Sequence, residues 1–146
     1  MCKERNVGFE FKIISNLIKR QIDNSANIQF LNSLTGTNSW IIGFLVENDS
    51  KDIFQRDLEE QFSIRRSTAS SIVKLMEQKG FITRVPVAND ARLKKIVLTP
   101  KAYELHETIS KDMIRFEQQL TSGLSNEELN AFFKVVDKIK SNIEQT

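Results

Sequence analysis

The feature that most constrains the fold of this chain is a change in the spacing of apolar residues at Gly80. The apolar residues before it are spaced as on one face of a helix: Ala69, Ile72, Val73 and Met76. They predict a helix from about Arg65 to Lys79, which Gly80 ends because glycine readily adopts a left-handed backbone. The β-branched and apolar runs Phe81 to Val85 and Lys95 to Leu98 then bracket a polar tip, Ala88 to Arg92. This pattern predicts a β-hairpin directly after the helix.

A shorter helix is expected before this one. Asp52 is placed to cap a helix from about Ile53 to Gln61, in which Leu58 and Phe62, four residues apart, face inward. Ser63-Ile64 then makes a tight turn. Two helices joined by a tight turn and followed by a β-hairpin form a winged helix-turn-helix, which we expect over residues 35–99.

Two further helices are expected before this pair. Ile14, Leu17 and Ile18 have helical spacing, which predicts a helix from about Phe9 to Ala26. Thr35 to Asn38 is a helix-start signal. The apolar stripe that follows it comprises Trp40, Ile41, Phe44 and Leu45.

Two long helices are expected after the hairpin. Thr99-Pro100 opens the first and Gly123 ends it, whereas Ser125 and Glu128 form a capping box for the second. The seam of the first comprises Ala102, His106, Ile109, Met113, Phe116 and Leu120. One side of the second carries Leu129, Phe132, Phe133, Val136, Ile139 and Ile143. These seams exceed what a core of this size can cover, so we expect a homodimer formed through residues 8–27 and 100–145.

Length and composition fit one mainly α domain, residues 1–146, with a small β-hairpin wing. The single cysteine, Cys2, excludes an internal disulfide framework and favours a reducing setting. There is no apolar run of membrane-spanning length and no signal peptide, so a cytoplasmic protein without membrane contact is expected. The net charge is only +2, yet residues 65–95 carry +6, a distribution typical of a binder of nucleic acid or an anionic surface.

The helix from Arg65 to Lys79 presents an unusual outer face opposite its apolar stripe. It is made of short hydroxyl side chains and one cation, Lys74, and its only carboxylate, Glu77, lies in the last turn. Such a face lets the backbone approach base edges and phosphates closely. A merely soluble helix with a small-residue face is the alternative.

The hairpin tip adds a second indication of DNA binding. Arg92 lies at the tip of a slim hairpin, which fits a narrow minor groove whose negative potential attracts a guanidinium group. Asp90 is expected to orient that guanidinium and to brace the hairpin. The alternative is an ordinary surface ion pair, worth about 0–1 kcal/mol.

These segments resemble the MarR (multiple antibiotic resistance regulator) family over nearly the whole chain. Asp90 to Pro100 resembles its wing signature, Arg66 to Val73 its recognition helix, and Met76 to Ile82 its entry to the wing. Leu34 to Ile42 is similar to the start of its second helix, and Gly123 to Leu129 to its last helix-helix turn.

The resemblance implies a homodimer whose first and last two helices intertwine. It also implies two recognition helices in successive major grooves, with wings in the flanking minor grooves. On this pattern Arg92 is the minor-groove residue and Asp90 its brace. Two departures are visible: Arg65 stands where the family often has a capping serine, so a weaker helix cap is expected, and Ser63 replaces a frequent turn glycine, so a tighter or strained turn is expected.

The candidate sites follow from these arguments. The residues expected to contact double-stranded DNA are Arg65, Arg66, Ser67, Thr68, Ser70, Ser71, Lys74, Arg84, Asn89, Asp90, Arg92, Lys94 and Lys95. Those expected at the dimer interface are Ile109, Leu120, Phe132, Val136, Ile139 and Ile143. Those that either line a pocket for a small aromatic or phenolic effector or simply pack in the core are Phe30, Trp40, Phe44, His106, Met113 and Phe116.

Two isolated residues each allow a functional interpretation and one without a function. His106, the only histidine, is either a pH- or ligand-responsive group or a hydrogen-bonded packing residue, and packing is favoured. Cys2 is either a peroxide-sensing thiol or an inert terminal residue, and the latter is favoured.

No motif supports catalysis, a metal site or a cofactor, so the chain is not expected to be an enzyme. The leading hypothesis is a DNA-binding regulator that acts as a repressor, binds a pseudo-palindromic operator and is released by a small ligand. One alternative keeps DNA binding without an effector. Another is a winged-helix module whose basic face binds a protein partner.

Overall fold

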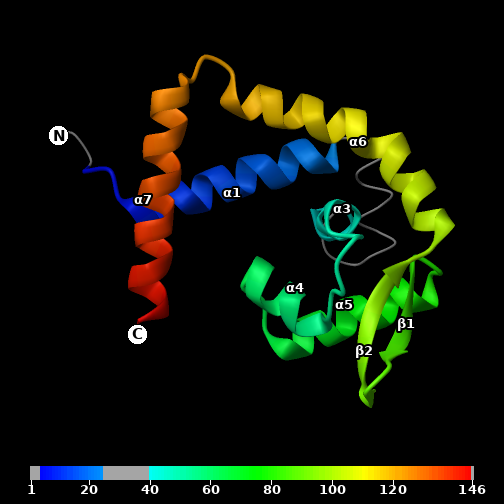
Figure 1. The fold of residues 1–146 in the computed structure, drawn as a ribbon. Helices are drawn as coiled ribbons and strands as arrows, with labels where there is room; N and C mark the ends of the chain where they lie inside the picture. The colour runs from blue at the N-terminus through cyan, green and yellow to red at the C-terminus, as the bar shows by residue number, and fades with distance from the viewer. Residues whose placement is uncertain (1–3, 25–39, 146) are drawn as a thin grey trace. The chain divides into compact units, whose positions relative to one another are not determined.

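The computed structural model describes residues 4–24 and 40–145 (Figure 1). The chain divides into two compact units, Met1–Asp112 and Met113–Thr146, which are described separately. The described elements of the first unit are α1 (Val7–Asp23), α3 (Trp40–Glu47), α4 (Gln55–Phe62), α5 (Arg66–Gln78), β1 (Ile82–Val87) and β2 (Asp90–Leu98). Helix α6 (Pro100–Thr121) crosses the division, and α7 (Asn126–Glu144) belongs to the second unit. This order confirms a mainly helical chain with a two-stranded hairpin.

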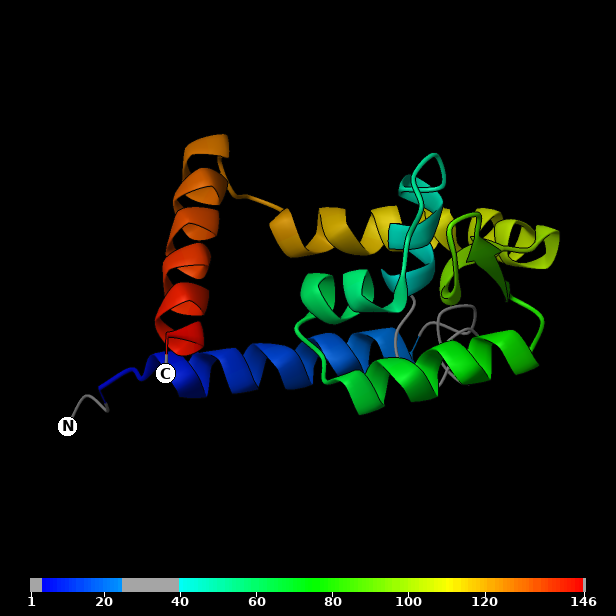
Figure 2. The same cartoon turned by 60° about the horizontal axis from the view of Figure 1, so that its bottom comes forward.

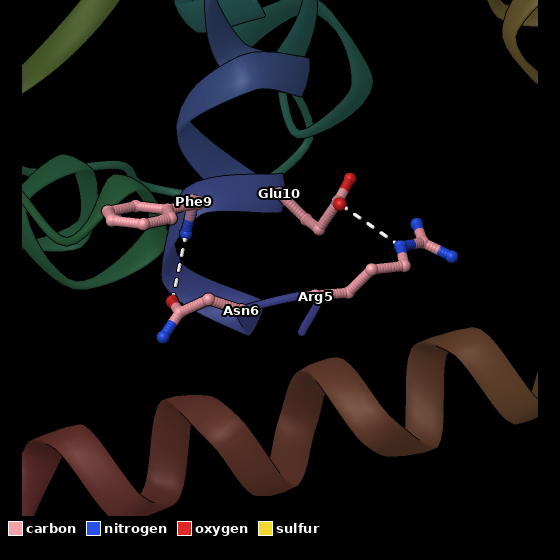
Figure 3. A network of polar contacts seen from close by, with 4 residues as sticks. All are labelled: Arg5, Asn6, Phe9 and Glu10. Atoms are coloured by element: carbon pink, nitrogen blue, oxygen red, sulfur yellow. Dashed lines mark hydrogen bonds and ion pairs between the residues drawn. The ribbon is translucent and has the colours of Figure 1, made fainter. Parts of the chain in front are cut away.

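Helix α1 begins two residues earlier than the sequence pattern predicts, because Asn6 caps it. The Asn6 side chain accepts a 3.2 Å hydrogen bond from the Phe9 backbone N–H, as Figure 3 shows. Arg5 donates from Nε to Glu10 at 3.1 Å, and this bond holds the pKa of the Glu10 carboxyl below its usual value. The helix ends at Asp23, and the predicted end at Ala26 lies outside the described residues.

The core of the first unit is built from side chains of α3, α4, α5, the hairpin and α6. Its fully buried side chains include Ile41, Ile42, Leu58, Val73, Met76, Phe81, Ile82 and Ile109. Helix α3 contributes Ile41, Ile42 and Leu45, while its expected start signal, Thr35 to Asn38, lies outside the described residues. The predicted inward stripe of α5 is confirmed, because Ala69, Ile72, Val73 and Met76 are all buried.

The start of α4 differs from the prediction. Asp52 does not cap it: the helix begins at Gln55, and the Asp57 carboxylate accepts a 2.8 Å hydrogen bond from the Phe54 backbone N–H. Asp52 instead forms a 3.4 Å ion pair with Lys95. A long-range partner has therefore replaced the local role that the sequence indicated for this carboxylate.

Figure 2 shows the short turn that joins α4 to α5. Ser63, in this turn, has a left-handed backbone with φ of 50°. The strain expected at this position is therefore present. Gly80 adopts φ of 80° directly after α5, as expected for a helix-ending glycine. These two residues set the direction in which the chain enters and leaves α5.

The hairpin has longer strands and a shorter tip than predicted. Its strands are antiparallel with Ile82 opposite Leu98 and Pro86 opposite Lys94, and only Ala88 and Asn89 form the turn. The register shifts between Pro86 and Val87, which pairs with Asp90. The predicted tip residues 90–92 therefore belong to a bulged part of β2, because pairing across the hairpin extends beyond the apolar runs.

The helix boundaries after the hairpin agree with the sequence. Thr99 Oγ1 lies 3.4 Å from the Ala102 backbone N–H and donates a 2.6 Å hydrogen bond to the carbonyl of Gly80. In the second unit, the Ser125 hydroxyl accepts from Glu128 N–H at 3.1 Å, and the Glu128 carboxylate accepts from Ser125 N–H at 3.2 Å. The predicted capping box is confirmed. Within the described residues, no helix combines the length and apolar character that crossing a bilayer would require.

Candidate nucleic-acid interface

The outer face of α5, defined here as Ser67, Thr68, Ser70, Ser71 and Lys74, is exposed along its whole length. The opposite side of the helix is buried in the core, so the helix is held rigidly while this face remains free. No acidic side chain occurs on α5 before Glu77. The Ser71 hydroxyl donates to the Ser67 carbonyl at 3.0 Å, which leaves its oxygen lone pairs facing outward as acceptors. The face can therefore approach a polyanion without repulsion and offers short donors and acceptors.

The first turn of α5 has no side-chain cap. Arg65 occupies the N-cap position, and a guanidinium group cannot accept a hydrogen bond. The weaker cap expected from the sequence is confirmed. Backbone N–H groups at the start of the helix remain available beside Arg65 and Arg66, an arrangement that attracts phosphate.

The Asp90 side chain contacts the backbone of Arg92 in the hairpin. Its Oδ1 accepts a 2.9 Å hydrogen bond from the Arg92 backbone N–H. This contact supports a bracing role, although it acts on the backbone of residue 92 and not on its guanidinium group. The side chain of Arg92 is exposed on β2, near the turn that contains Asn89. The local bulge determines the direction of the Arg92 side chain. The contact of Arg92 with DNA stays a prediction.

The basic residues of the region fall into two groups. Arg84 is held by Glu77 through two contacts of 3.3 Å, and Lys95 by Asp52 at 3.4 Å. Within the part of the chain that the structure describes, the other predicted cations form no ion pair; they are Arg65, Arg66, Lys74, Arg92 and Lys94. The second group is therefore better placed to neutralise phosphates than Arg84 and Lys95.

A concave basic groove of about 410 Å³ lies between α4, α5 and the hairpin. Arg66 and Val73 line it from α5, and Arg92 and Lys94 line it from β2. Arg56 lines it from α4, with its guanidinium carbon 5.5 Å from the centre of the Phe54 ring. Sequence analysis missed Arg56 because its candidate DNA contacts all lie between Arg65 and Lys95. The signal that could have found it was a cation at the start of the preceding helix.

The candidate effector residues differ in their surroundings. Phe30 lies outside the described residues, Trp40 is exposed, and Phe44 packs edge-on against Phe62 at 5.7 Å. His106 Nδ1 is buried and finds no hydrogen-bond partner among the residues that the structure describes, contrary to the favoured view of a satisfied packing histidine. Met113 and Phe116 belong to the second unit and are half-buried, so the pocket stays a prediction. Cys2 also lies outside the described residues.

The candidate dimer residues differ in how deeply they are buried. Ile109 is 0% exposed, so its side chain belongs to the core of one chain and is not a free surface. On α7 no residue is buried, and Phe132 and Ile143 are 51% and 67% exposed. Leu120 is exposed, while Val136 and Ile139 are half-buried. Apart from Ile109, these side chains remain available to a partner.

The described residues contain no group of three or more His, Cys, Asp or Glu side chains that could hold a metal ion. Near the hairpin, the Tyr103 hydroxyl donates a 3.1 Å hydrogen bond to the Asp49 carboxylate. Partial desolvation and the Asp49 carboxylate both raise the pKa of its hydroxyl. This contact lies outside the basic groove.

A family model described as the MarR family matches residues 32–93, which include α3, α4, α5 and most of the hairpin. The chain is 25% identical over 129 residues to the uncharacterized HTH-type transcriptional regulator YybA from Bacillus subtilis (strain 168). That match covers 88% of this chain and 85% of YybA.

Two solved structures resemble the whole fold. The transcription regulator MarR from Oenococcus oeni PSU-1 is 35% identical with a TM-score of 0.80, and the match covers 93% of this chain and 99% of that one. MepR from S. aureus, solved as a complex with DNA, is 25% identical with a TM-score of 0.79. That match covers 94% of this chain and 96% of MepR.

Proposed function

The chain belongs to the MarR family, and from this premise we propose that it is a transcriptional regulator that binds specific double-stranded DNA. The observation that carries the proposal is the outer face of α5, which is exposed, free of carboxylates before Glu77, and followed by a hairpin bearing Arg92. MepR, which shares the fold at 25% identity, was solved bound to DNA. The outer face of α5 would enter a major groove, and Arg92 would enter the adjacent minor groove.

The functional unit is proposed to be a homodimer. Helix α7 buries none of its residues within one chain, and α1 exposes apolar side chains such as Phe9 and Leu17. A second copy would remove these surfaces from water, since contiguous apolar patches of this kind are rare on monomers. A two-fold dimer presents two copies of α5, so the operator would be pseudo-palindromic.

A repressor released by a small aromatic or phenolic ligand is the mode of regulation that we propose. The support is His106, whose Nδ1 is buried and has no hydrogen-bond partner within the described part of the chain, so it could bond a polar group of a ligand. The second candidate is a winged-helix module that binds a protein partner or is controlled by one, without a small ligand. The unpaired cations of α5 and β2 support it equally, since an acidic protein surface could replace DNA.

Selection of bound DNA from a random pool tests the central proposal. We expect two related half-sites whose centres lie about 10 base pairs, or a multiple, apart. Placing the selected site ahead of a reporter gene would then show reduced transcription when the protein is present. Recovery of unrelated sequences, with binding that is insensitive to salt, would contradict sequence-specific DNA binding and favour the protein-partner alternative.

The ligand is tested separately with the selected site. Phenolic compounds should lower the affinity of the wild-type protein for this DNA, and His106→Phe should weaken that response while leaving affinity in the absence of ligand intact. A screen in which no compound shifts either DNA affinity or melting temperature would contradict release by a ligand of this class and leave DNA binding standing.

A further inference from the structure

The basic groove between α4, α5 and β2 collects more positive charge than any helix face described above. Five cations line it: Arg56, Arg66, Arg84, Arg92 and Lys94. The single carboxylate among its lining residues is Glu59, on the same side of α4 as Arg56. Like charges gathered in a concave site repel one another and concentrate anions there. The groove therefore has the electrostatics of an anion site.

Few of these cations are neutralised inside the protein. Arg84 is paired with Glu77 at 3.3 Å, but the described residues provide no ion pair to Arg56, Arg66, Arg92 or Lys94. Arg56 rests over the Phe54 ring, a contact that orients the guanidinium group without consuming its N–H donors. Its donors remain free for a bidentate contact with a phosphate.

The position of the groove indicates which phosphate it suits. Its walls are Arg66 and Val73 of α5, which are seven residues apart and so lie on one side of the helix, and Arg92 to Lys94 of the hairpin. A major groove and the adjacent minor groove of B-DNA are separated by one sugar-phosphate strand. If α5 occupies one and the hairpin the other, that strand crosses the space between them, where the basic groove lies.

We propose that the basic groove binds a backbone phosphate of the DNA strand that passes between α5 and the hairpin, and that Arg56 of α4 is one of its phosphate ligands. This inference rests on the proposed function. Arg56 is on the helix that precedes the outer face of α5, so it contacts the sugar-phosphate backbone and carries no sequence preference. Glu59 opposes the phosphate and limits the affinity.

The test is the salt dependence of DNA affinity for wild type, Arg56→Ala and Arg56→Lys on one selected site and one unrelated duplex. Loss of one phosphate contact lowers the slope of log affinity against log salt by about 0.9. Between about 50 and 200 mM salt, wild-type affinity should therefore fall about 3.5-fold more than that of Arg56→Ala. The loss should be equal on both duplexes, and Arg56→Lys should restore most of the slope.

Glu59→Gln and Lys51→Ala complete the design. Glu59→Gln removes the opposing carboxylate and should tighten binding to both duplexes. Lys51→Ala removes one exposed positive charge from a residue outside the groove and should leave the slope as in wild type. Matched melting temperatures establish that each variant is folded.

The outcomes separate the two proposals. An Arg56→Ala slope equal to that of wild type overturns the groove assignment and leaves the proposed function intact, whereas wild-type protein without salt-dependent DNA binding overturns the proposed function itself. Inorganic phosphate identifies the third outcome. If it raises the melting temperature of wild type but not of Arg56→Ala, relative to chloride at equal ionic strength, while the DNA slopes are the same, the groove binds free phosphate and not the DNA backbone.

Discussion

The backbone N–H of Ile96 in β2 donates a 2.7 Å hydrogen bond to the carbonyl oxygen of Ile53, in the segment just before α4. Both side chains are buried, and the neighbouring Lys95 and Asp52 form an ion pair at 3.4 Å. The hairpin is therefore tied to the segment that leads into the helix-turn-helix, in addition to its covalent link to α5. Since Arg92 and the outer face of α5 lie on elements joined in this way, their spacing is set by the folded unit and not by a free loop.

Removal of the Asp57 carboxylate should destabilise the protein more than removal of the Asp52 carboxylate. Asp57→Ala loses the 2.8 Å bond from Phe54 N–H at the start of α4, a loss of about 1 kcal/mol in the free energy of unfolding. Asp52→Ala breaks an exposed ion pair worth about 0–1 kcal/mol. Denaturant titrations of the two variants check the order. The reverse order would mean that Asp52 caps the helix, as its sequence position suggests.

Replacement of Ser63 by glycine should stabilise the turn between α4 and α5. The left-handed φ of 50° costs an ordinary residue about 1–2 kcal/mol, and glycine avoids this cost while its unfolded chain gains about 0.4–1 kcal/mol of entropy. We expect a net gain of up to about 1 kcal/mol for Ser63→Gly and a loss for Ser63→Val, measured by chemical denaturation. Ser50→Gly, at a position without a positive φ, is the matched control and should be slightly destabilising.

The structural features that could be predicted from the sequence are those whose interacting residues lie close together along the chain. Gly80, Thr99 and the Ser125/Glu128 capping box were predictable because each acts within a few residues of itself. The bulge near Arg92 was not, because the register of two strands depends on pairing across the whole hairpin. The same limit explains Asp52, whose partner Lys95 is 43 residues away.

The candidate site shows the same division. The exposed outer face of α5 follows from helical periodicity and was correctly predicted to be opposite the buried stripe. The basic groove could not be predicted in this way, because its cations come from four elements that only the tertiary fold brings together. Arg56 was not predicted as a DNA contact because each helix was considered alone.

Arg92→Ala should weaken DNA binding more than Arg84→Ala. Arg92 has no ion pair in the described part of the chain, whereas both Arg84 contacts are already made to Glu77. We expect a loss of about 1–3 kcal/mol for Arg92→Ala if its contact is specific, and a smaller loss for Arg84→Ala. Fluorescence anisotropy with the selected site measures both. An unchanged affinity for Arg92→Ala at physiological salt would remove Arg92 from the interface.

The stability of the first unit should fall at alkaline pH because of Tyr103. Its hydroxyl pKa is raised in the folded state by partial desolvation and by Asp49, so the folded chain holds this proton more tightly than the unfolded chain. The contribution is complete below the unfolded pKa of about 10 and is lost as pH rises through the folded value. Tyr103 is the only tyrosine, so ultraviolet absorbance follows its ionisation directly.

The control for this pH effect is Tyr103→Phe, which keeps the ring and removes the ionisable group. Its melting temperature should decline less than that of wild type between about pH 8 and 11. Equal declines would show that other groups cause the alkaline loss, and a wild-type titration at or below the ordinary tyrosine pKa would contradict the contact with Asp49.

A charge placed on the exposed apolar side of α7 should separate the proposed dimer without unfolding either chain. Phe132 is 51% exposed and α7 buries none of its residues within one chain, so Phe132→Glu costs the isolated protomer little packing beyond the ring contact with Phe133 at 5.5 Å. In a dimer the same side chain would become buried, and an unpaired carboxylate at an apolar interface costs several kcal/mol. Sedimentation should therefore report a monomer, and circular dichroism should show unchanged helical content. Asn130→Glu, which adds the same charge about half a turn away on α7, should remain dimeric.

The Phe132→Glu monomer should also lose most of its affinity for the two-half-site operator while retaining weak, salt-dependent binding to one half-site. A Phe132→Glu protein that sediments as wild type does would place the dimer contact on another surface.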